Sequence, residues 1–244
     1  MFQDVFTRQT SDVLGDRDVP SQLECEYIDN GQTRDAIYFH GFGSTNWRGF
    51  LFHHQNKLPV NHLVCKDSLD NEFNWKNVLQ KIPEVVDAYA HELHKRYKES
   101  DRELVIITES LGGFIATDVL RKLQTQNPKI YARVSNMILL APLFPDAPIG
   151  ESPSDTQIQQ LPRMGNIPPL PSEKITIVYS SYDPIVGNHP KYLKETWGIT
   201  SSFEYECPIY LSKISSFCHS MLDWLPSVNE FLAKDVLSEE KDKI

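Results

Sequence analysis

One stretch of the chain, from Glu103 to Ala116, constrains its fold more than any other. It opens with an apolar, β-branched run of strand length, Leu104 to Ile107, and continues through Thr-Glu-Ser-Leu-Gly-Gly. The pattern predicts a buried strand that ends in a sharp turn, with Ser110 at the tip of that turn. A helix is predicted directly afterwards, because apolar residues recur there at helical spacing: Phe114, Ile115, Val119, Leu120 and Leu123.

The predicted turn gives the hydroxyl of Ser110 a reactive setting. A sharp strand-to-helix turn strains the serine backbone and exposes its hydroxyl above the carboxyl end of the strand. Gly112 allows the helix to begin close against the strand, and Gly113 keeps the approach clear. The N–H groups at the start of the helix favour negative charge that develops near the hydroxyl.

The segment from Thr108 to Gly112 resembles the nucleophile elbow of the α/β-hydrolase superfamily, Gly-x-Ser-x-Gly, with Thr108 in place of the first glycine. The resemblance implies an α/β-hydrolase fold, in which helices flank a mostly parallel central sheet. It also implies that Ser110 is a catalytic nucleophile. Members of this superfamily carry an oxyanion strand, the serine, an acid and a histidine in that order along the chain.

A glycine-rich turn lies ahead of the serine, where the apolar run from Ala36 to Phe39 meets His-Gly-Phe-Gly. This suits an oxyanion loop, because a backbone N–H reaches a substrate oxygen only where no side chain blocks it. The resemblance implies that the N–H groups of Phe42 and Leu111 hold the oxyanion. His40 is expected to brace the loop rather than to act as the base. The expected supporting residues are His40, Gly41, Gly43 and Gly112.

Asp183 is the expected acid, because it follows the carboxyl end of a predicted strand, Ile175 to Tyr179. The turn Asp-Pro-Ile-Val resembles the acid loop of the superfamily. A carboxylate there accepts the Nδ1–H of a histidine and stabilises the imidazolium that forms. Two alternatives stay open. Asp183 is also typical of a turn aspartate before proline, and Asp146, after the preceding strand, is the second candidate for the acid.

His219 is the expected base. It lies between the last predicted strand, within residues 203–210, and a C-terminal segment with helical periodicity, which is where the superfamily carries its base. Of the eight histidines, it alone follows both Ser110 and Asp183 at a suitable element end, whereas His189 comes too soon after the aspartate.

The chain is long enough for one α/β domain, which we expect to span residues 21–234. Residues 1–20 are polar and aperiodic and predict a loosely held arm, and residues 235–244 form a charged tail. Residues 143–172 are rich in proline and predict a short lid-like insertion or pocket wall after the sixth strand, with a proline-stiffened surface loop as the alternative. A strand over 23–28, followed by Asp-Asn-Gly, predicts a hairpin-type antiparallel pair at the sheet edge.

Charge and composition argue against several classes of binding partner. The formal net charge of −9, with scattered lysine and arginine, argues against nucleic acid. No apolar run reaches membrane-span length and the first residues lack a secretory layout, so we expect a cytoplasmic protein without integral membrane association. The four cysteines show no CxxC pairing and predict neither a zinc site nor a disulfide framework. No metal or organic cofactor is expected.

The resemblance implies a carboxylesterase-like serine hydrolase that forms an acyl-enzyme on Ser110. Its expected partner is a small-molecule ester, which includes lipid esters and thioesters. The alternatives are a non-catalytic protein of the same fold that binds a ligand or a protein partner, and an acyltransferase that uses the same triad with an alcohol as acceptor. The sequence leaves the natural substrate and the oligomeric state open.

Overall fold

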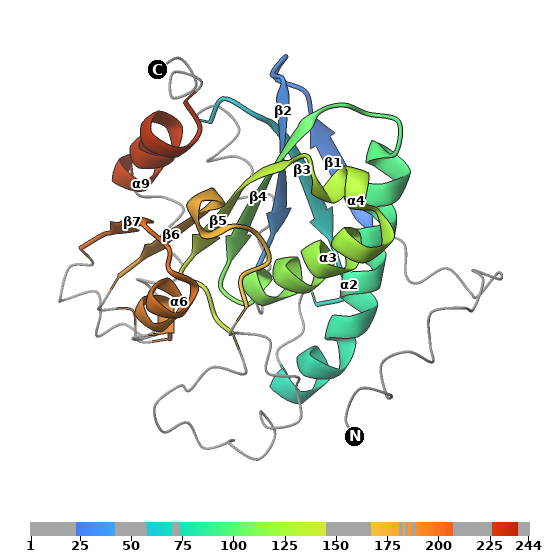
Figure 1. The fold of residues 1–244 in the computed structure, drawn as a ribbon. Coiled ribbons are helices and arrows are strands. Elements are labelled where there is room, and N and C mark those ends of the chain that lie inside the picture. Colours follow the sequence, from blue (N-terminus) through green and yellow to red (C-terminus); the bar gives the residue numbers. More distant parts are fainter. Residues whose placement is uncertain are drawn as a thin grey trace, which may run out of the picture.

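A computed structural model describes residues 23–41, 58–69, 74–144, 167–180, 183, 185–186, 189–206 and 226–238. These residues form a seven-stranded sheet that is covered by helices (Figure 1). The strands are β1 (Glu24–Ile28), β2 (Arg34–Phe39), β3 (Asn61–Lys66), β4 (Glu103–Glu109), β5 (Val134–Leu140), β6 (Ile175–Tyr179) and β7 (Ser201–Glu204). The helical elements are α2 (Trp75–Tyr97), α3 (Gly112–Gln126), α4 (Pro128–Tyr131), η1 (Ser172–Lys174), α6 (His189–Trp197), α9 (Pro226–Phe231) and the π-helical turn η3 (Leu232–Val236).

The strand order across the sheet is β1-β3-β2-β4-β5-β6-β7. Among the described strands, β2 to β7 are parallel and β1 alone is antiparallel to its neighbour. The chain therefore leaves every parallel strand at the same edge, which is the lower edge in Figure 1. This confirms the prediction of a mostly parallel sheet with an antiparallel strand at its edge.

Two predictions about that edge were wrong. No hairpin joins the first two strands, because β3 lies between β1 and β2. The second wrong prediction concerned the cysteines, for which no disulfide was expected. The pairing of β1 with β3 places Cys25 opposite Cys65, and the two form a disulfide. The cysteine spacing gave no sign of this bond, since the partners are 40 residues apart and only the strand pairing brings them together.

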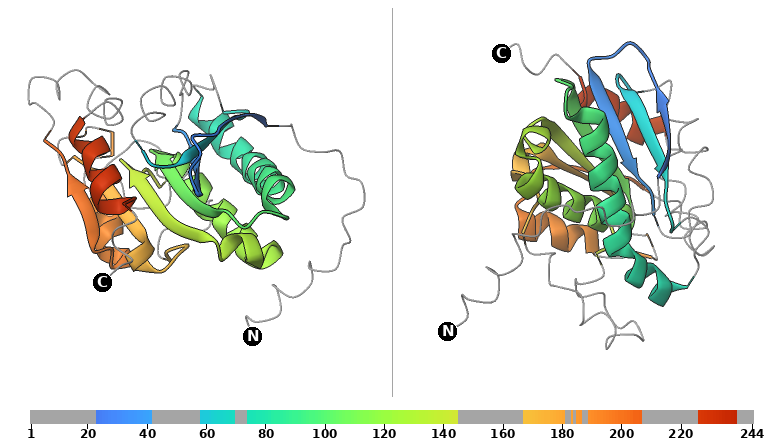
Figure 2. Two further views of the ribbon diagram at one scale, coloured as in Figure 1. Left: turned by 90° about the horizontal axis from the view of Figure 1, so that it is seen from above. Right: turned by 90° about the vertical axis from the view of Figure 1, so that its right-hand side faces the viewer.

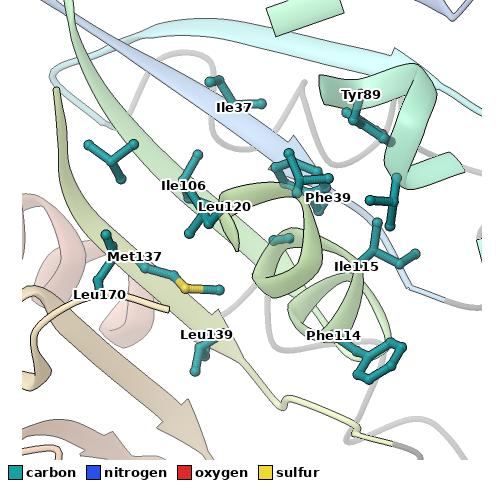
Figure 3. Packing of buried hydrophobic residues seen from close by; sticks show 14 of the residues in the cluster. Ile37, Phe39, Tyr89, Ile106, Phe114, Ile115, Leu120, Met137, Leu139 and Leu170 are labelled. Atoms are coloured by element: carbon teal, nitrogen blue, oxygen red, sulfur yellow. The ribbon is translucent and has the colours of Figure 1, made fainter. Parts of the chain in front are cut away.

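Apolar side chains cover both faces of the sheet because successive strand residues point to opposite sides. Ile37 and Ile106 face one layer, which contains the buried residues of α2, α3 and α6, while Ala36 and Val105 face the layer that contains α9 and η3. Figure 3 shows α3 packed over the first face, and Figure 2 shows α9 on the other side of the sheet from α2. With both faces filled, the strand ends are the places left for a site. None of the helices in the described ranges is long and apolar enough to cross a membrane.

The C-terminal packing extends past residue 234, where the domain was expected to end. The turn η3 runs to Val236, and Leu237 is fully buried with its carbonyl oxygen accepting a hydrogen bond from the Arg34 guanidinium. Beyond the predicted boundary, the tail is therefore held by two apolar side chains, Val236 and Leu237, and by one backbone acceptor. Residues 1–22 and most of the 143–172 insertion lie outside the described residues. The strand before the insertion is β5, the fifth described strand rather than the sixth.

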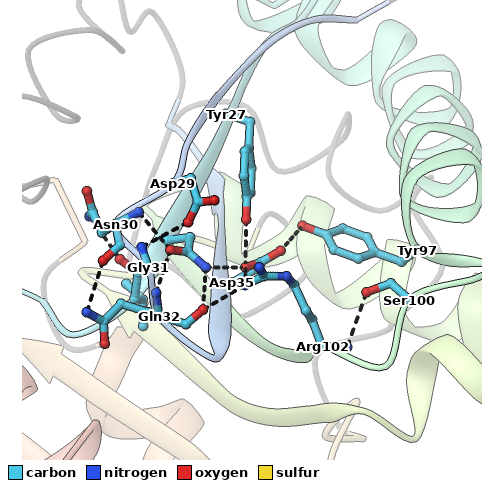
Figure 4. A network of polar contacts seen from close by, with 11 residues as sticks. Tyr27, Asp29, Asn30, Gly31, Gln32, Asp35, Tyr97, Ser100 and Arg102 are labelled. Atoms are coloured by element: carbon cyan, nitrogen blue, oxygen red, sulfur yellow. Dashed lines mark hydrogen bonds and ion pairs between the residues drawn. The ribbon is translucent and has the colours of Figure 1, made fainter.

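A polar network stabilises the edge where β2 begins, opposite to the edge where it ends (Figure 4). The buried Asp35 carboxylate accepts hydrogen bonds from the hydroxyls of Tyr27 and Tyr97, both at 3.1 Å, from the Asn61 amide at 2.8 Å and from Arg102 at 3.2 Å. Burial and the nearby Asp35 charge raise the pKa of Tyr27 to about 12 and also raise the pKa of Tyr97. The network joins β1, β2, β3 and the end of α2 at this edge.

Candidate active site

The turn between β4 and α3 has the predicted strand, turn and helix, with Ser110 directly after β4. Ser110 has a φ of 51°, in the left-handed region that residues with a side chain rarely adopt. Its N–H donates to the Leu140 carbonyl at 2.9 Å, and its own carbonyl accepts from the N–H groups of Gly113 at 3.1 Å and Leu143 at 3.0 Å. Three backbone hydrogen bonds therefore hold the strained serine in place.

Two glycines bring the end of β2 against this turn. A Cβ on Gly112 would lie 2.0 Å from the carbonyl oxygen of Phe39, so only glycine allows α3 to begin there. A Cβ on Gly41 would lie 2.9 Å from the Cβ of Ser110. Ser110 is only 4% exposed, in contrast to the exposed hydroxyl that the turn pattern predicts.

Thr108 occupies the position of the first glycine in the elbow pattern, and the structure accounts for this departure. Its side chain is fully buried, and its Oγ1 donates to the carbonyl of Ile138 on β5 at 3.3 Å. A Cβ on Gly113 would lie 3.4 Å from this hydroxyl, so the glycine leaves room for it. The threonine therefore fits without burying an unpaired polar group.

His40 and Asp67 follow the ends of the neighbouring strands β2 and β3 and lie side by side. The His40 Nε2 is 3.3 Å from the Asp67 Oδ2, and the two side chains are 8% and 3% exposed. The His40 Nδ1 is 3.2 Å from the carbonyl oxygen of Gly41. Sequence reasoning missed Asp67, although its signal was the one that pointed to Asp183, an acid directly after a buried strand.

Asp183 lies just beyond β6 and is 2% exposed. Its N–H donates to the Ser180 carbonyl at 3.2 Å, and its Oδ1 accepts from the N–H groups of Ile185 at 2.8 Å and Val186 at 3.3 Å. Because β5 separates β4 from β6, Ser110 and Asp183 follow strands whose axes are about 10 Å apart. A third group is needed to connect the two side chains.

The structure brings some of the predicted site residues together and does not describe others. Leu111 is the N-cap residue of α3, where the first N–H groups of the helix lack intrahelical partners. The residues brought together at the ends of β2 and β4 are His40, Gly41, Ser110, Leu111 and Gly112. The predicted residues outside the described ranges are Phe42, Gly43, Asp146 and His219.

His189 is the first residue of α6, and its side chain is buried. It is 4% exposed, and its ring stacks on Phe144 at a centroid distance of 6.0 Å. Phe144 in turn packs beside Gly113, where a Cβ would lie 3.3 Å from its ring. Burial lowers the pKa of His189 to about 4, and its ring nitrogens have no hydrogen-bond partner within the described part of the chain. The ring is therefore neutral at pH 7.

The described residues offer no metal centre, since no three His, Cys, Asp or Glu side chains among them come together. They do line a cavity of about 350 Å³ on the opposite edge of the sheet, where β4 begins. Ser110 follows the other end of β4, so this cavity is separate from the candidate active site. Its charged lining residues are Asp101, Glu103, Arg133 and Lys174.

No protein-family model and no curated protein matches this chain. Solved structures do match it. An esterase from Pyrobaculum calidifontis superposes with a TM-score of 0.55 at 13% identity, over 87% of this chain and 82% of that chain. The dienelactone hydrolase from Anabaena variabilis gives a TM-score of 0.51 at 15% identity, over 86% and 90% of the two chains. A type II thioesterase from the yersiniabactin NRPS/PKS pathway gives 0.51 at 13% identity, over 84% and 98%. The chain has the α/β-hydrolase fold.

Proposed function

We propose that the protein is a serine hydrolase that cleaves an ester bond through an acyl-enzyme on Ser110. One observation carries the proposal. Ser110 has a left-handed backbone conformation between the central parallel strand β4 and the helix α3, and it lies against Gly41, which follows the neighbouring strand β2. Strained residues of this kind persist where function requires them. The matched structures named as an esterase, a dienelactone hydrolase and a thioesterase support ester chemistry.

In the proposed reaction, His219 accepts the proton of Ser110 as the serine Oγ attacks the carbonyl carbon of the ester. The tetrahedral intermediate collapses, the bond to the leaving alcohol breaks, and His219 returns the proton to that alcohol. A water molecule then attacks the acyl-enzyme while His219 takes its proton. The acid is released and Ser110 regains its hydroxyl hydrogen.

The backbone N–H groups of Leu111 and Phe42 hold the oxyanion in this proposal. Two features support the assignment. Leu111 stands at the amino terminus of α3, where the helix dipole and the free N–H groups favour negative charge. Phe42 follows Gly41, whose backbone lies against Ser110.

The sheet topology supports the roles of Asp183 and His219. The chain leaves β6 and β7 at the same edge as β4, because these strands are parallel. Asp183 follows β6, and the segment that contains His219 connects β7 to α9. In this proposal, the imidazole of His219 lies between the serine and the aspartate, and the aspartate fixes its tautomer.

The test is hydrolysis of p-nitrophenyl acetate, butyrate and octanoate by the parent protein and its variants. We expect the parent to release p-nitrophenol, and Ser110→Ala and His219→Ala each to lower kcat by roughly 10³-fold or more. Ser135→Ala is the matched control, because this serine lies on β5 and donates to the Leu104 carbonyl at the far end of the strands. A folded parent without activity, or an active Ser110→Ala protein, would contradict the proposal.

The same assay separates the two alternatives. An added alcohol that captures most of the acyl group in place of water identifies an acyltransferase. A folded parent that binds the esters without turnover identifies a binding protein. A set of thioesters of matching chain length extends the assay to the thioesterase chemistry named for one of the matched structures.

A further inference from the structure

A buried pair of side chains links two parallel strands beside the serine. His40 directly follows β2 and Asp67 directly follows β3, and these strands are hydrogen-bonded neighbours. The His40 Nε2 and the Asp67 Oδ2 are 3.3 Å apart, and neither side chain is more than 8% exposed. A charged pair shielded from water in this way interacts more strongly than an exposed pair.

Both ring nitrogens of His40 face oxygen acceptors. The Nδ1 is 3.2 Å from the Gly41 carbonyl, and the Nε2 is 3.3 Å from the Asp67 Oδ2, which is an ion-pair distance without hydrogen-bond geometry. A carbonyl and an ionised carboxylate only accept hydrogen bonds, so the imidazolium, with a proton on each nitrogen, suits both.

Asp67 is itself held firmly. Its Oδ1 accepts from the N–H of Leu69 at 2.8 Å, and Leu69 is 2% exposed in the core. The Nζ of Lys81 on α2 donates to the carbonyl of Ser68 at 3.2 Å. The carboxylate that meets His40 therefore belongs to a turn fixed by the core and by α2.

The backbone that follows His40 transmits this position to the serine. A Cβ on Gly41 would lie 2.9 Å from the Cβ of Ser110 and 3.6 Å from its Oγ. The Gly41 carbonyl also contacts the His40 ring. The His40 ring is therefore in direct contact with the peptide that lies against the serine.

We propose that Asp67 is a positioning residue of the candidate active site. By pairing with the His40 imidazolium, it fixes the Gly41 peptide against Ser110 and sets the start of the oxyanion loop. The inference rests on the proposed function, because the position of this loop is read out through the reaction of Ser110. Loss of the Asp67 charge lowers kcat more than it raises KM, since oxyanion contacts strengthen in the transition state.

The test compares Asp67→Asn and Asp67→Ala with a matched control, Asp29→Asn. Asp29 makes the same kind of local bond, to the N–H of Gly31 at 2.9 Å, in an exposed turn away from the serine. Asparagine at position 67 keeps the acceptor for the backbone but loses the charge. For p-nitrophenyl butyrate we expect Asp67→Asn to lower kcat by about 10-fold with KM changed less than about twofold, Asp67→Ala to lower kcat further, and Asp29→Asn to match the parent.

The ring state of His40 is the second readout. In ¹⁵N NMR spectra at pH 7, with His40 assigned through its own backbone, we expect two protonated ring nitrogens in the parent and one in Asp67→Asn. A neutral His40 ring in the parent would overturn the proposal even if the Asp67 variants do not fold.

The outcomes also distinguish this inference from the proposed function. A parent that hydrolyses the ester, with an Asp67→Asn protein that keeps its kcat and only melts earlier, shows a merely structural aspartate and overturns the inference alone. A folded parent that neither hydrolyses esters nor reacts with a fluorophosphonate overturns both.

Discussion

The lack of a Cβ atom at Gly112 and Gly113 is essential to the packing of the candidate site. A Cβ on Gly112 would meet the backbone of β2 at 2.0 Å from the Phe39 oxygen. The next residue, Gly113, is different, because a Cβ there would meet only side-chain atoms, with the Leu139 methyl and the Phe144 ring both at 3.3 Å. Backbone atoms of a central strand cannot yield, whereas side chains can adjust by a few tenths of an ångström.

We therefore expect Gly112→Ala to destabilise the protein much more than Gly113→Ala does. Overpacking against backbone should lower the free energy of unfolding by roughly 3 kcal/mol or more in Gly112→Ala. In Gly113→Ala the strain is offset by a gain in helix propensity of about 1 kcal/mol, which leaves a small net change. Urea unfolding followed by circular dichroism measures both values. Equal losses in the two variants would contradict the packing of α3 on β2.

His189 should make the stability depend on pH. Burial lowers its pKa from 6.5 to about 4, so the unfolded chain binds a proton over this range that the folded chain does not. The contribution of the neutral ring is complete above pH 6.5 and is lost as the pH falls toward 4, with a total of about 3 kcal/mol. His189→Phe keeps an aromatic ring against Phe144 and removes the titration. Urea unfolding at several pH values should give a flatter profile for this variant, and identical profiles would count against a buried neutral histidine.

At the scale of elements, the edge strand β1 depends on a single neighbour. Its strand partner is β3, and the disulfide between Cys25 and Cys65 crosses this pairing. A cross-link restricts the unfolded chain, and the restriction grows with the length of the loop that it closes. The bond therefore adds a covalent link to a strand that has backbone ladder hydrogen bonds on one side only.

We expect the double variant Cys25→Ala and Cys65→Ala to unfold more easily than the parent. For partners 40 residues apart, the chain-entropy model gives a loss of up to about 4 kcal/mol in the free energy of unfolding. Thermal and urea unfolding with and without a reductant should show this loss in the reduced parent and no further effect of the reductant on the variant. A parent whose stability is unaffected by reductant would argue against the bond.

Across the whole molecule, the stabilising polar network and the candidate active site lie at opposite ends of the parallel strands. The Asp35 network lies where β2 begins, and the candidate active site lies where β2 and β4 end. Stability and reactivity should therefore respond to different substitutions. The neutral hydrogen bond from Tyr131 to the Pro169 carbonyl provides a matched control for the charged bond between Tyr97 and Asp35.

Tyr97→Phe should lower stability and leave the reaction of Ser110 unchanged. Its hydroxyl donates to a buried carboxylate, and loss of such a bond costs about 1.5–3 kcal/mol, compared with about 1 kcal/mol for Tyr131→Phe. Urea unfolding and p-nitrophenyl butyrate hydrolysis measure the two properties on the same samples. A fall in kcat without a fall in stability would mean that the two edges are coupled.

Local patterns in the sequence predicted the parts of the fold that depend on neighbouring residues. The apolar run from Leu104 to Ile107, followed by Ser110 and two glycines, predicted the strand, turn and helix that the structure contains. The mostly parallel sheet was implied by the resemblance to the α/β-hydrolase superfamily, and the strand pairings confirm it. The position of Asp183 after β6 was likewise predictable, because it is a property of one strand and the turn behind it.

Features that join distant segments could not be predicted from these patterns. The disulfide and the His40–Asp67 pair both depend on β3, whose position between β1 and β2 no local signal fixes. The burial of Leu237 depends in the same way on Arg34, at the other end of the chain. The roles of Phe42 and His219 remain predictions.

The most direct measurement is the intact mass of the protein after incubation with a fluorophosphonate, which reacts with activated serines. The parent, Ser110→Ala and His219→Ala proteins are compared after circular dichroism has shown that each is folded. The proposed triad predicts one label per parent chain, none on Ser110→Ala, and labelling of His219→Ala that is slower by roughly 10³-fold or more. A folded parent that takes no label, or a Ser110→Ala protein that is labelled as fast as the parent, would contradict Ser110 as the nucleophile.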